Sequence, residues 1–275
     1  MTQSPPTQSP PTQTPPTQSP STLNLELRDS LAFLTLARPE AANTMNLQFG
    51  REFLAAALAI EAARVRAVVL TGQGKNFCFG GDLKGMVASG ADVSAYLSEL
   101  TTNLHAGMAL LARLDAPVIA AVNGTAAGAG LGLVLAADLA VAARGAKFVL
   151  AYTGVGLTPD AGCSFLLPRA VGYKRAMELL LTNRVLDAQQ ALEWGLVNQV
   201  VDDERLAQTA AALAERLAAG PVGAFGAVKR LLAEAEPAFE AQLARESRSI
   251  AARGTTAEGR EGIAAFLEKR TPQFR

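Results

Sequence analysis

The sequence predicts an α/β fold in which buried strands alternate with helices. Two short apolar runs, 67–70 and 117–122, have the length of buried strands, and each is followed by a glycine-rich turn. A helical pattern comes after each turn, and strands that alternate with helices in this way form a sheet with crossover connections. The chain has 275 residues and is 49% hydrophobic, so it is long enough to bury a large core.

The first 22 residues lack the side chains that a folded segment needs. They repeat a pentapeptide rich in proline, threonine and glutamine, and they hold seven of the fourteen prolines. Such a segment buries too little apolar surface to offset its ordering entropy. We therefore predict a disordered tail over residues 1–22, with a docking site for a proline-binding module as the alternative.

The next elements follow from apolar periodicity. Alternating leucines from Leu23 to Leu36 predict a hairpin with its turn at 28–30. An apolar stripe over about 46–64 predicts a helix, which leads to the buried strand at 67–70. A second helix, over about 93–114, leads to the buried strand at 117–122 in the same way.

The second half of the chain is predicted to be mostly helical. A helix is expected over about 131–140, before short strands near Val141 and Phe148, and nearly all of the pattern beyond Pro168 is helical. We predict an α/β core over 23–202 and a helical region over 203–275. That region contains one helix with apolar residues at Leu206, Ala210, Leu213 and Leu217, which ends at Gly220, and Pro221 starts the next helix. The last segment, over 227–270, is predicted to be helical with breaks near Pro237 and Gly254.

Composition excludes several classes of protein. The 25 Lys and Arg balance the 25 Asp and Glu, so no basic field would attract nucleic acid or an anionic membrane. A single histidine and two distant cysteines, Cys78 and Cys163, do not form a zinc or redox motif. The chain shows neither a membrane-spanning apolar run nor a signal peptide. We expect a cytoplasmic protein with no metal and with no nucleic-acid or membrane partner.

Two glycine-rich loops, 77–83 and 123–132, follow predicted buried strands. Glycine lets backbone N–H groups approach a ligand closely, and the second loop opens a helix whose dipole favours negative charge. Together the loops are suited to an anion or oxyanion hole, whereas a tight turn without a ligand is the better explanation for either loop alone. The spacing of Gly128, Gly130 and Gly132 is not that of a dinucleotide-binding loop, and no phosphate-loop lysine follows.

Five motifs are spread along the chain in an order that is typical of one enzyme family. They are Arg38-Pro39 with Asn43, residues 77–83, Ala121-Val122-Asn123-Gly124, Pro159-Asp160-Ala161-Gly162 and Phe266-Leu267-Glu268-Lys269-Arg270. With these motifs the chain resembles the crotonase (enoyl-CoA hydratase/isomerase) superfamily from Leu23 to Phe274. The resemblance implies a spiral of ββα units, C-terminal helices that build homotrimers or hexamers, an acyl-CoA substrate and no cofactor beyond the coenzyme A of that substrate.

The resemblance also implies where the reaction takes place. The thioester carbonyl would lie between the backbone N–H groups of Gly81 and Ala129, which stabilise an enolate oxygen, and one such donor is worth ~3 kcal/mol. Many relatives have glycine at Ala129, but the main-chain N–H is the donor, so we expect the hole to be retained. Asp82 is expected to cap or brace its turn.

The carboxylates favour an isomerase over a hydratase. Hydratases of the family use two glutamates, and these positions are Gly132 and Tyr152 here. Asp160 matches the only catalytic carboxylate of several family isomerases, including the ring-epoxide isomerase of phenylacetyl-CoA breakdown. The alternative for Asp160 is the N-cap of a helix over 161–167. We predict an acyl-CoA isomerase in which Asp160 moves a proton.

Other activities within the family stay open. The 4-chlorobenzoyl-CoA dehalogenases are similar in having an Asp at Asp160 and a His at His105, so a dehalogenase or another acyl-CoA hydrolase is the alternative, with Tyr152 in place of their assisting Trp. An ordinary helix histidine is the other interpretation of His105. Some relatives bind RNA, which the balanced charge disfavours.

The remaining candidates concern the binding of coenzyme A and the walls of the site. Arg38, Phe266 and Lys269 are expected to contact coenzyme A, the last two in a neighbouring subunit, although an amphipathic end helix explains the last two equally well. Cys163 and Ser164 are interpreted as wall residues, because no nucleophile-elbow motif surrounds the serine.

Overall fold

Three consecutive ββα units build the core of the protein. The computed structural model describes residues 21–88, 93–233, 256–258, 261, 265, 268 and 270–274. Its strands are β1 (Leu23–Arg28), β2 (Leu31–Leu36), β3 (Ala67–Gly72), β4 (Asn76–Cys78), β5 (Val118–Val122), β6 (Thr125–Ala127), β7 (Leu139–Ala143), β8 (Lys147–Val149), β9 (Leu186–Asp187) and β10 (Gln199–Val201). Its α-helices are α1 (Leu47–Ala63), α2 (Leu83–Ala88), α3 (Val93–Arg113), α4 (Ala129–Ala136), α5 (Cys163–Val171), α6 (Tyr173–Thr182), α7 (Ala188–Glu193), α8 (Leu206–Ala218) and α9 (Val222–Ala233).

The strands form two sheets, and each ββα unit contributes one strand to each sheet. The larger sheet has the order β1-β2-β3-β5-β7-β10, and the smaller has the order β4-β6-β8-β9. Only β1–β2 and β8–β9 pair antiparallel among the described strands. The units β3-β4, β5-β6 and β7-β8 each place their first strand in the larger sheet and their second in the smaller. The expected spiral of ββα units is confirmed.

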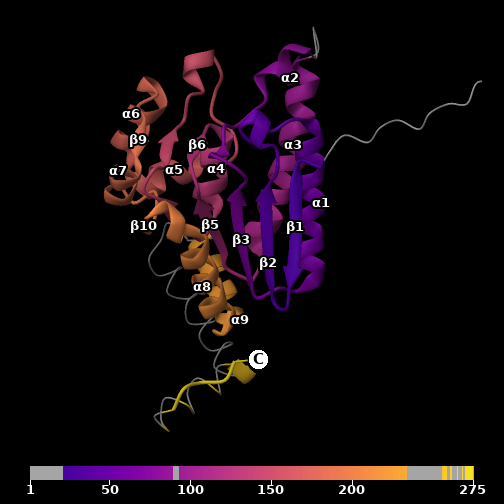
Figure 1. The fold of residues 1–275 in the computed structure, drawn as a ribbon, viewed down its shortest axis with the longest axis vertical. Coiled ribbons are helices and arrows are strands. Elements are labelled where there is room, and N and C mark those ends of the chain that lie inside the picture. The colour runs from indigo at the N-terminus through magenta and orange to yellow at the C-terminus, as the bar shows by residue number, and fades with distance from the viewer. Residues whose placement is uncertain are drawn as a thin grey trace, which may run out of the picture.

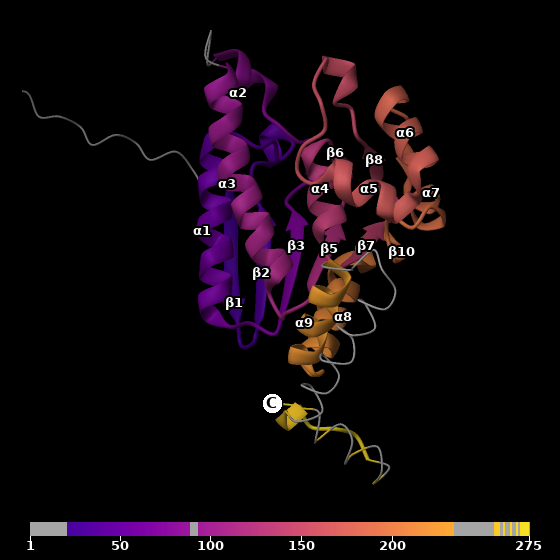
Figure 2. The same cartoon turned by 180° about the vertical axis from the view of Figure 1, so that it is seen from behind.

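Helices cover both faces of the larger sheet. Figures 1 and 2 show α1 and α3 over the face formed by β1, β2 and β3, whereas α8 packs on the opposite face of β3, β5 and β7. Because strand residues alternate between faces, Val68 and Leu70 join the core under α3 and α4, while Ala67 and Val69 join a second cluster under α8. Both faces are therefore buried, as continuous apolar strands require.

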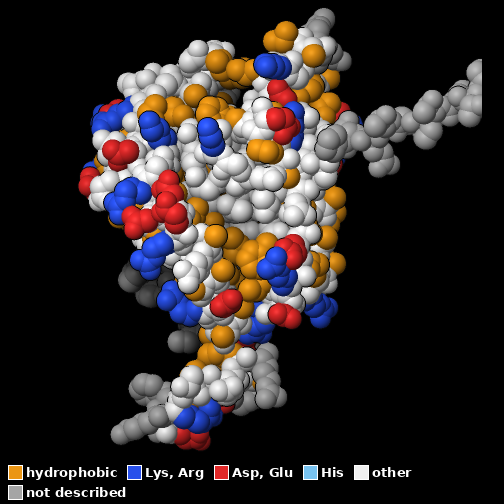
Figure 3. Space-filling model, viewed as in Figure 1, with side chains coloured by type: hydrophobic (Ala, Val, Ile, Leu, Met, Phe, Trp, Pro, Cys, Tyr) orange, Lys and Arg blue, Asp and Glu red, His pale blue; other side chains and the backbone are white. Residues whose placement is uncertain are grey.

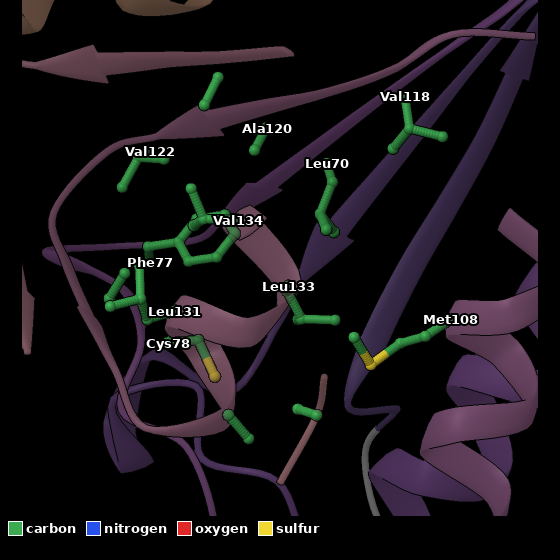
Figure 4. Packing of buried hydrophobic residues seen from close by; sticks show 14 of the residues in the cluster. Leu70, Phe77, Cys78, Met108, Val118, Ala120, Val122, Leu131, Leu133 and Val134 are labelled. Carbon is green, nitrogen blue, oxygen red and sulfur yellow. The ribbon is translucent and has the colours of Figure 1, made fainter. Parts of the chain in front are cut away.

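The main core surrounds α4. Figure 4 shows side chains from the parallel strands, from β4, from α4 and from α3 meeting there, with Met108 of α3 on the side of Leu133. Residues 129–134 of α4 are all buried, so this short helix is enclosed by packing on all sides. Such enclosure fixes the position of its N-terminus, which lies at the site described below.

Most predicted elements are confirmed, with two differences. The first helix begins where its N-cap Asn46 accepts a hydrogen bond from Phe49 N. The helix predicted over 131–140 instead occupies Ala129–Ala136, because Gly128 with φ 52° makes the turn and residues 139–142 pair with β5 as a strand. Asp138, between that helix and strand, accepts from Val118 N at 2.8 Å. The short strands β9 and β10 also interrupt the part predicted to be helical.

The predicted tail over 1–22 extends two residues too far. Thr22 is 2% exposed, and its N and Oγ1 donate to Glu52 Oε2 of α1 at 2.7 and 2.6 Å. Ser21 Oγ also donates to this carboxylate at 3.1 Å. A single carboxylate thus anchors the start of the folded chain, which local composition did not indicate. Residues 1–20 lie outside the described residues.

The helical region begins as expected with α8, whose Leu206, Ala210, Ala214 and Ala218 are buried at a spacing of four. The next helix, α9, starts at Val222, directly after Pro221 as predicted, and its Lys229 pairs with Asp138 at 2.8 Å. Most of the predicted segment beyond 233 lies outside the described residues.

Charges of both signs are mixed on the surface. On the face seen in Figure 3, Lys and Arg side chains are interspersed with Asp and Glu. Within the described ranges, no helix is long and apolar enough to cross a membrane. In the same ranges, no group of three or more His, Cys, Asp or Glu side chains is arranged to hold a metal ion.

Candidate active site

A cavity of about 480 Å³ lies where the two glycine-rich loops meet the segment 149–160 and one face of α3. Its lining includes Gly81, Ala129, Tyr152 and Asp160, which the sequence had singled out. The other described lining side chains are mostly apolar, and among the described residues of the lining only Asp160 carries a charge. The cavity therefore combines an apolar wall with one carboxylate and two candidate backbone donors.

The first loop is held by backbone contacts around Gly81. Met45 N donates to Gly80 O at 2.8 Å, and Asp82 N donates to Met45 O at 2.9 Å. This β-bridge to Met45 therefore uses main-chain groups of the residues before and after Gly81, and it leaves the N–H of Gly81 itself unused. Gly80 has a φ of 79°, and a Cβ there would lie 2.8 Å from Ala127 O and 3.2 Å from Ala129 N. Glycine at position 80 thus allows the two loops to touch.

The second loop delivers Ala129 as the first residue of α4. Gly128 N donates to Val149 O at 3.0 Å, and Gly128 forms the N-cap without a side-chain hydrogen bond. The first N–H groups of a helix have no partner within the helix. Among the described residues, neither Gly81 N–H nor Ala129 N–H donates a hydrogen bond to another group. Both amides are available to a ligand oxygen in the cavity.

Two glycines of α4 let the helix approach its neighbours. A Cβ at Gly130 would lie 2.3 Å from Cys78 O, and a Cβ at Gly132 would lie 2.6 Å from both Cβ and O of Ala161. Gly132 therefore packs directly against the turn of Asp160. A longer side chain at Gly132 would displace that turn.

Asp82 braces the first loop, as the sequence predicts. Its Oδ1 accepts from Gly85 N at 3.1 Å in the first turn of α2, and its Oδ2 pairs with Arg38 at 3.2 Å. Arg38 also donates to Thr44 O at 2.7 Å, and its side chain is 19% exposed. The guanidinium of Arg38, which is expected to contact coenzyme A, thus links the segment that follows β2 to the first glycine-rich loop.

The carboxylate of Asp160 accepts a hydrogen bond from a neighbouring phenol. Tyr152 Oη donates to Asp160 Oδ1 at 2.5 Å, and both side chains are half-buried. Burial first, and then the neighbouring Cys163 and Asp160, raise the pKa of Tyr152 far above its usual value. Tyr152 therefore stays protonated and acts as a hydrogen-bond donor to the carboxylate.

The N-cap interpretation of Asp160 is wrong. Ala161 and Gly162 both have positive φ, 48° and 74°, so α5 starts only at Cys163 with Gly162 as its N-cap. No side chain caps that helix, and Cys163 N donates to the main-chain O of Asp160 at 2.9 Å. The Asp160 side chain is consequently directed to Tyr152 and the cavity instead of capping a helix.

His105 lies next to the same turn. Ala161 N donates to His105 Nε2 at 3.2 Å, although 56 residues separate the two in the chain. The structure thus brings together Asp160, Tyr152 and His105, which the sequence had proposed as a base and two accessory residues. Cys163 is buried behind them, and burial raises the pKa of its thiol to about 12. Ser164 is exposed.

Two groups of residues are not shared by the sequence interpretation and the described cavity. Phe266 and Lys269, predicted to contact coenzyme A, lie outside the described residues. Leu97, Leu100 and Leu104 of α3 line the cavity but were interpreted only as part of a helix. Their spacing of three and four residues indicates one helical face, yet periodicity cannot distinguish a cavity wall from a core.

Comparisons with known proteins agree with this geometry. Residues 26–275 match the family described as Enoyl-CoA hydratase/isomerase. The chain is 42% identical over 251 residues to a 1,2-epoxyphenylacetyl-CoA isomerase of Escherichia coli, covering 88% of this chain and 93% of the relative. It is also 42% identical over 254 residues to a probable enoyl-CoA hydratase of Rhodobacter capsulatus, covering 92% and 97%.

Two further matches point to the same family. A 4-chlorobenzoyl coenzyme A dehalogenase of an Arthrobacter species is 39% identical over 214 residues, covering 77% of this chain and 78% of the relative. The crystal structure of an enoyl-CoA hydratase from Polaromonas superposes with a TM-score of 0.87 at 36% identity, covering 92% of this chain and 99% of that one. With the fold, the two amide loops and these matches in agreement, the chain belongs to the enoyl-CoA hydratase/isomerase family, the crotonase superfamily.

Proposed function

We propose that this enzyme is an acyl-CoA isomerase in which Asp160 is the single proton-transferring base. The observation that carries the proposal is that Asp160 is the only charged side chain among the described residues of the cavity lining. Isomerisation requires one base, which removes a proton at one carbon and returns it at another. Hydration requires in addition a group that activates water, and this family uses a second carboxylate for that purpose.

The reaction would proceed through an enolate. Asp160 Oδ2, which does not bind Tyr152, takes a proton from C2 of a 3-enoyl-CoA, and the electrons of the C–H bond move onto the thioester oxygen. The N–H groups of Gly81 and Ala129 stabilise that oxygen as its charge develops. The enolate then collapses, and protonated Asp160 returns its proton to C4, which leaves a 2-enoyl-CoA. A positioned base typically contributes ~10²–10⁴-fold to such a step.

The groups beside Asp160 support one base and argue against two. Tyr152 stands at one hydratase glutamate position, and its raised pKa keeps it a neutral donor that cannot take a proton from water. Gly132 stands at the other, and it packs against Ala161 without space for a carboxylate. A relative named as a hydratase is as similar to the chain as the named isomerase, so overall identity does not distinguish the two reactions. The residues at positions 132 and 152 are therefore our basis for proposing an isomerase.

The cavity wall favours an uncharged, apolar acyl group. Leu97, Leu100 and Leu104 of α3 form one side, and Val155 and Leu157 extend the wall toward Asp160. Such a wall suits an aliphatic chain or an unsubstituted ring, and its described side chains provide no partner for a charged acyl group. We propose that coenzyme A enters only as part of the substrate, that no further cofactor is used, and that the enzyme works in the cytoplasm as a homotrimer or hexamer.

A 4-halobenzoyl-CoA dehalogenase is the second candidate. The Arthrobacter relative and the proximity of Asp160 to His105 favour it. In that reaction Asp160 would attack the ring carbon and displace the halide, and water activated by His105 would then hydrolyse the resulting aryl ester, which frees Asp160. His105 Nε2 already accepts the N–H of Ala161, however, and therefore does not face water with that nitrogen. We place this activity second.

The test is to assay several thioesters with the same purified enzyme. Isomerisation of a 3-enoyl-CoA, hydration of a 2-enoyl-CoA, conversion of a ring-epoxide thioester and dehalogenation of 4-chlorobenzoyl-CoA are measured in parallel. We expect turnover of the 3-enoyl or ring-epoxide thioester, and negligible hydration. Strong hydration or halide release would contradict the proposal.

Asp160→Asn identifies the base. The amide has nearly the shape of the carboxylate, so we expect kcat for isomerisation to fall ~10²–10⁴-fold while thioester binding changes little. Asp29→Asn is the matched control, because Asp29 is exposed in the hairpin turn and asparagine tolerates its φ of 52°. Full activity in Asp160→Asn would show that another residue is the base.

A further inference from the structure

The turn that carries Asp160 has an unusual backbone conformation. Ala161 has a φ of 48° and is fully buried, although left-handed conformations are disfavoured for residues with a Cβ. Such a conformation persists only where the surroundings hold it in place. Two contacts do so here: Gly132 of α4 packs against Ala161, and His105 of α3 accepts its N–H.

The contact with His105 specifies one form of the imidazole. Nε2 lies 3.2 Å from Ala161 N and accepts its hydrogen, so this nitrogen is unprotonated. The proton of the neutral ring is then on Nδ1. Loss of this acceptor would leave the N–H of Ala161 without a partner in a buried position, which is unfavourable.

We propose that His105 is a positioning residue, which fixes the Asp160 turn through the main chain and takes no part in proton transfer. This inference rests on the proposed role of Asp160 as the base. Tyr152 holds the carboxylate through Oδ1, and His105 holds the backbone one residue further on. Together they fix the direction in which Oδ2 faces the substrate. A base displaced by about 1 Å loses ~100-fold in rate, so this contact controls turnover.

Substitutions that keep or remove the acceptor test the proposal. In His105→Gln the side-chain Oε1 reaches about as far as Nε2 and accepts the same N–H, whereas His105→Leu cannot accept it. We expect kcat for isomerisation to fall ~100-fold in His105→Leu with KM nearly unchanged, and to recover to within about tenfold of the wild type in His105→Gln. Ala109→Leu, exposed one turn further along α3, is the control for added apolar surface.

Two kinetic outcomes would overturn the proposal. Equal damage in His105→Gln and His105→Leu would mean that the imidazole itself takes part in the chemistry, as a water-activating base would. Unchanged kcat in His105→Leu would mean that the turn holds its position without the acceptor.

The state of the imidazole can be measured without any substrate. His105 is the only histidine, so the ¹⁵N spectrum of the wild-type protein contains one pair of imidazole signals. For the neutral ring, we expect Nδ1 to carry the proton and Nε2 to be an acceptor. The opposite tautomer would overturn the contact with Ala161. If instead the tautomer is as expected and the wild type isomerises none of the thioesters, the proposed function fails while the positioning contact stands.

Discussion

The two amide loops and the Asp160 turn face the same cavity, but different kinds of contact hold them in place. Around Gly81 and Ala129 the contacts are between main-chain groups: a bridge to Met45, a bond to Val149 and close packing of glycines. Around Asp160 two of the contacts use side chains, the hydroxyl of Tyr152 and the imidazole of His105.

This difference distinguishes main-chain features, which any sequence with this fold can provide, from side-chain features, which we expect to select the reaction. Main-chain donors depend little on side-chain identity, so an enolate can be stabilised by many sequences that adopt the fold. The proposed base, Asp160, is held by a few replaceable side chains, so we expect their replacement to change which protons move. We therefore expect substitutions in the loops to lower kcat with every thioester, and substitutions around Asp160 to impair the proton transfer.

After loss of the Asp160 carboxylate itself, the largest effect is expected where the two loops touch. Gly80→Ala places a Cβ 2.8 Å from Ala127 O and 3.2 Å from Ala129 N, and it strains a backbone with a φ of 79°. The loops must move apart, which removes at least one donor from the position of the enolate oxygen. We expect kcat to fall ~10²–10³-fold with every thioester that the enzyme turns over. Steady-state kinetics on two substrates measures this loss.

A second glycine separates backbone strain from loss of the donor. Gly156 has a φ of 71°, and a Cβ added there would meet nothing within 4 Å among the described residues, so Gly156→Ala adds strain without a clash. We expect it to lower the free energy of unfolding by about 1–2 kcal/mol and to leave kcat nearly unchanged. Equal kcat losses in both variants would mean that strain alone explains the effect of Gly80→Ala.

A smaller effect is expected at the side-chain contact of the base. Tyr152→Phe keeps the ring but removes the hydroxyl that donates to Asp160 Oδ1. A hydrogen bond to a charged group is worth about 1.5–3 kcal/mol, so we expect kcat to fall roughly 10–100-fold with little change in KM. Tyr173→Phe, at an exposed tyrosine of α6, is the matched control. An unchanged kcat in Tyr152→Phe would show that the base does not need its donor.

The same difference explains how much of the molecule could be predicted from the sequence. Apolar runs and glycine clusters report on burial and tight turns, so the order of the strands and helices and both amide loops were predictable. The start of α4 was not, because Gly130 and Gly132 indicate a loop although they lie inside a helix that packs closely on Cys78 and Ala161.

Contacts between distant side chains were the least predictable part. The pairing of Arg38 with Asp82 and of His105 with Ala161 joins residues that are 44 and 56 positions apart, and no local pattern specifies either. The residues of the base region were named from a family resemblance, but their bonding partners became visible only in three dimensions. Likewise, two consecutive left-handed residues, Ala161 and Gly162, delay the start of α5 in a way that the aspartate alone does not indicate.

The smallest effect is expected at Cys163, which lies between the two regions. Its Sγ is 3.9 Å from both Tyr152 Oη and Gly128 O, distances at which a thiol interacts weakly. Burial raises the pKa of this thiol to about 12, so the thiolate is scarce at neutral pH and becomes abundant only as the pH approaches 12. We expect Cys163→Ala to change kcat by less than about threefold.

Alkylation tests the protonation of the thiol. A thiol of ordinary pKa, near 8.5, reacts with iodoacetamide at pH 8, whereas we expect the folded enzyme to stay active under these conditions. Cys78, whose pKa is also raised to about 12 by burial, should be equally protected, and both thiols should react once the chain is unfolded. Rapid inactivation of the wild type but not of Cys163→Ala would instead place a reactive thiolate beside the base, and the two regions would then share a chemical group.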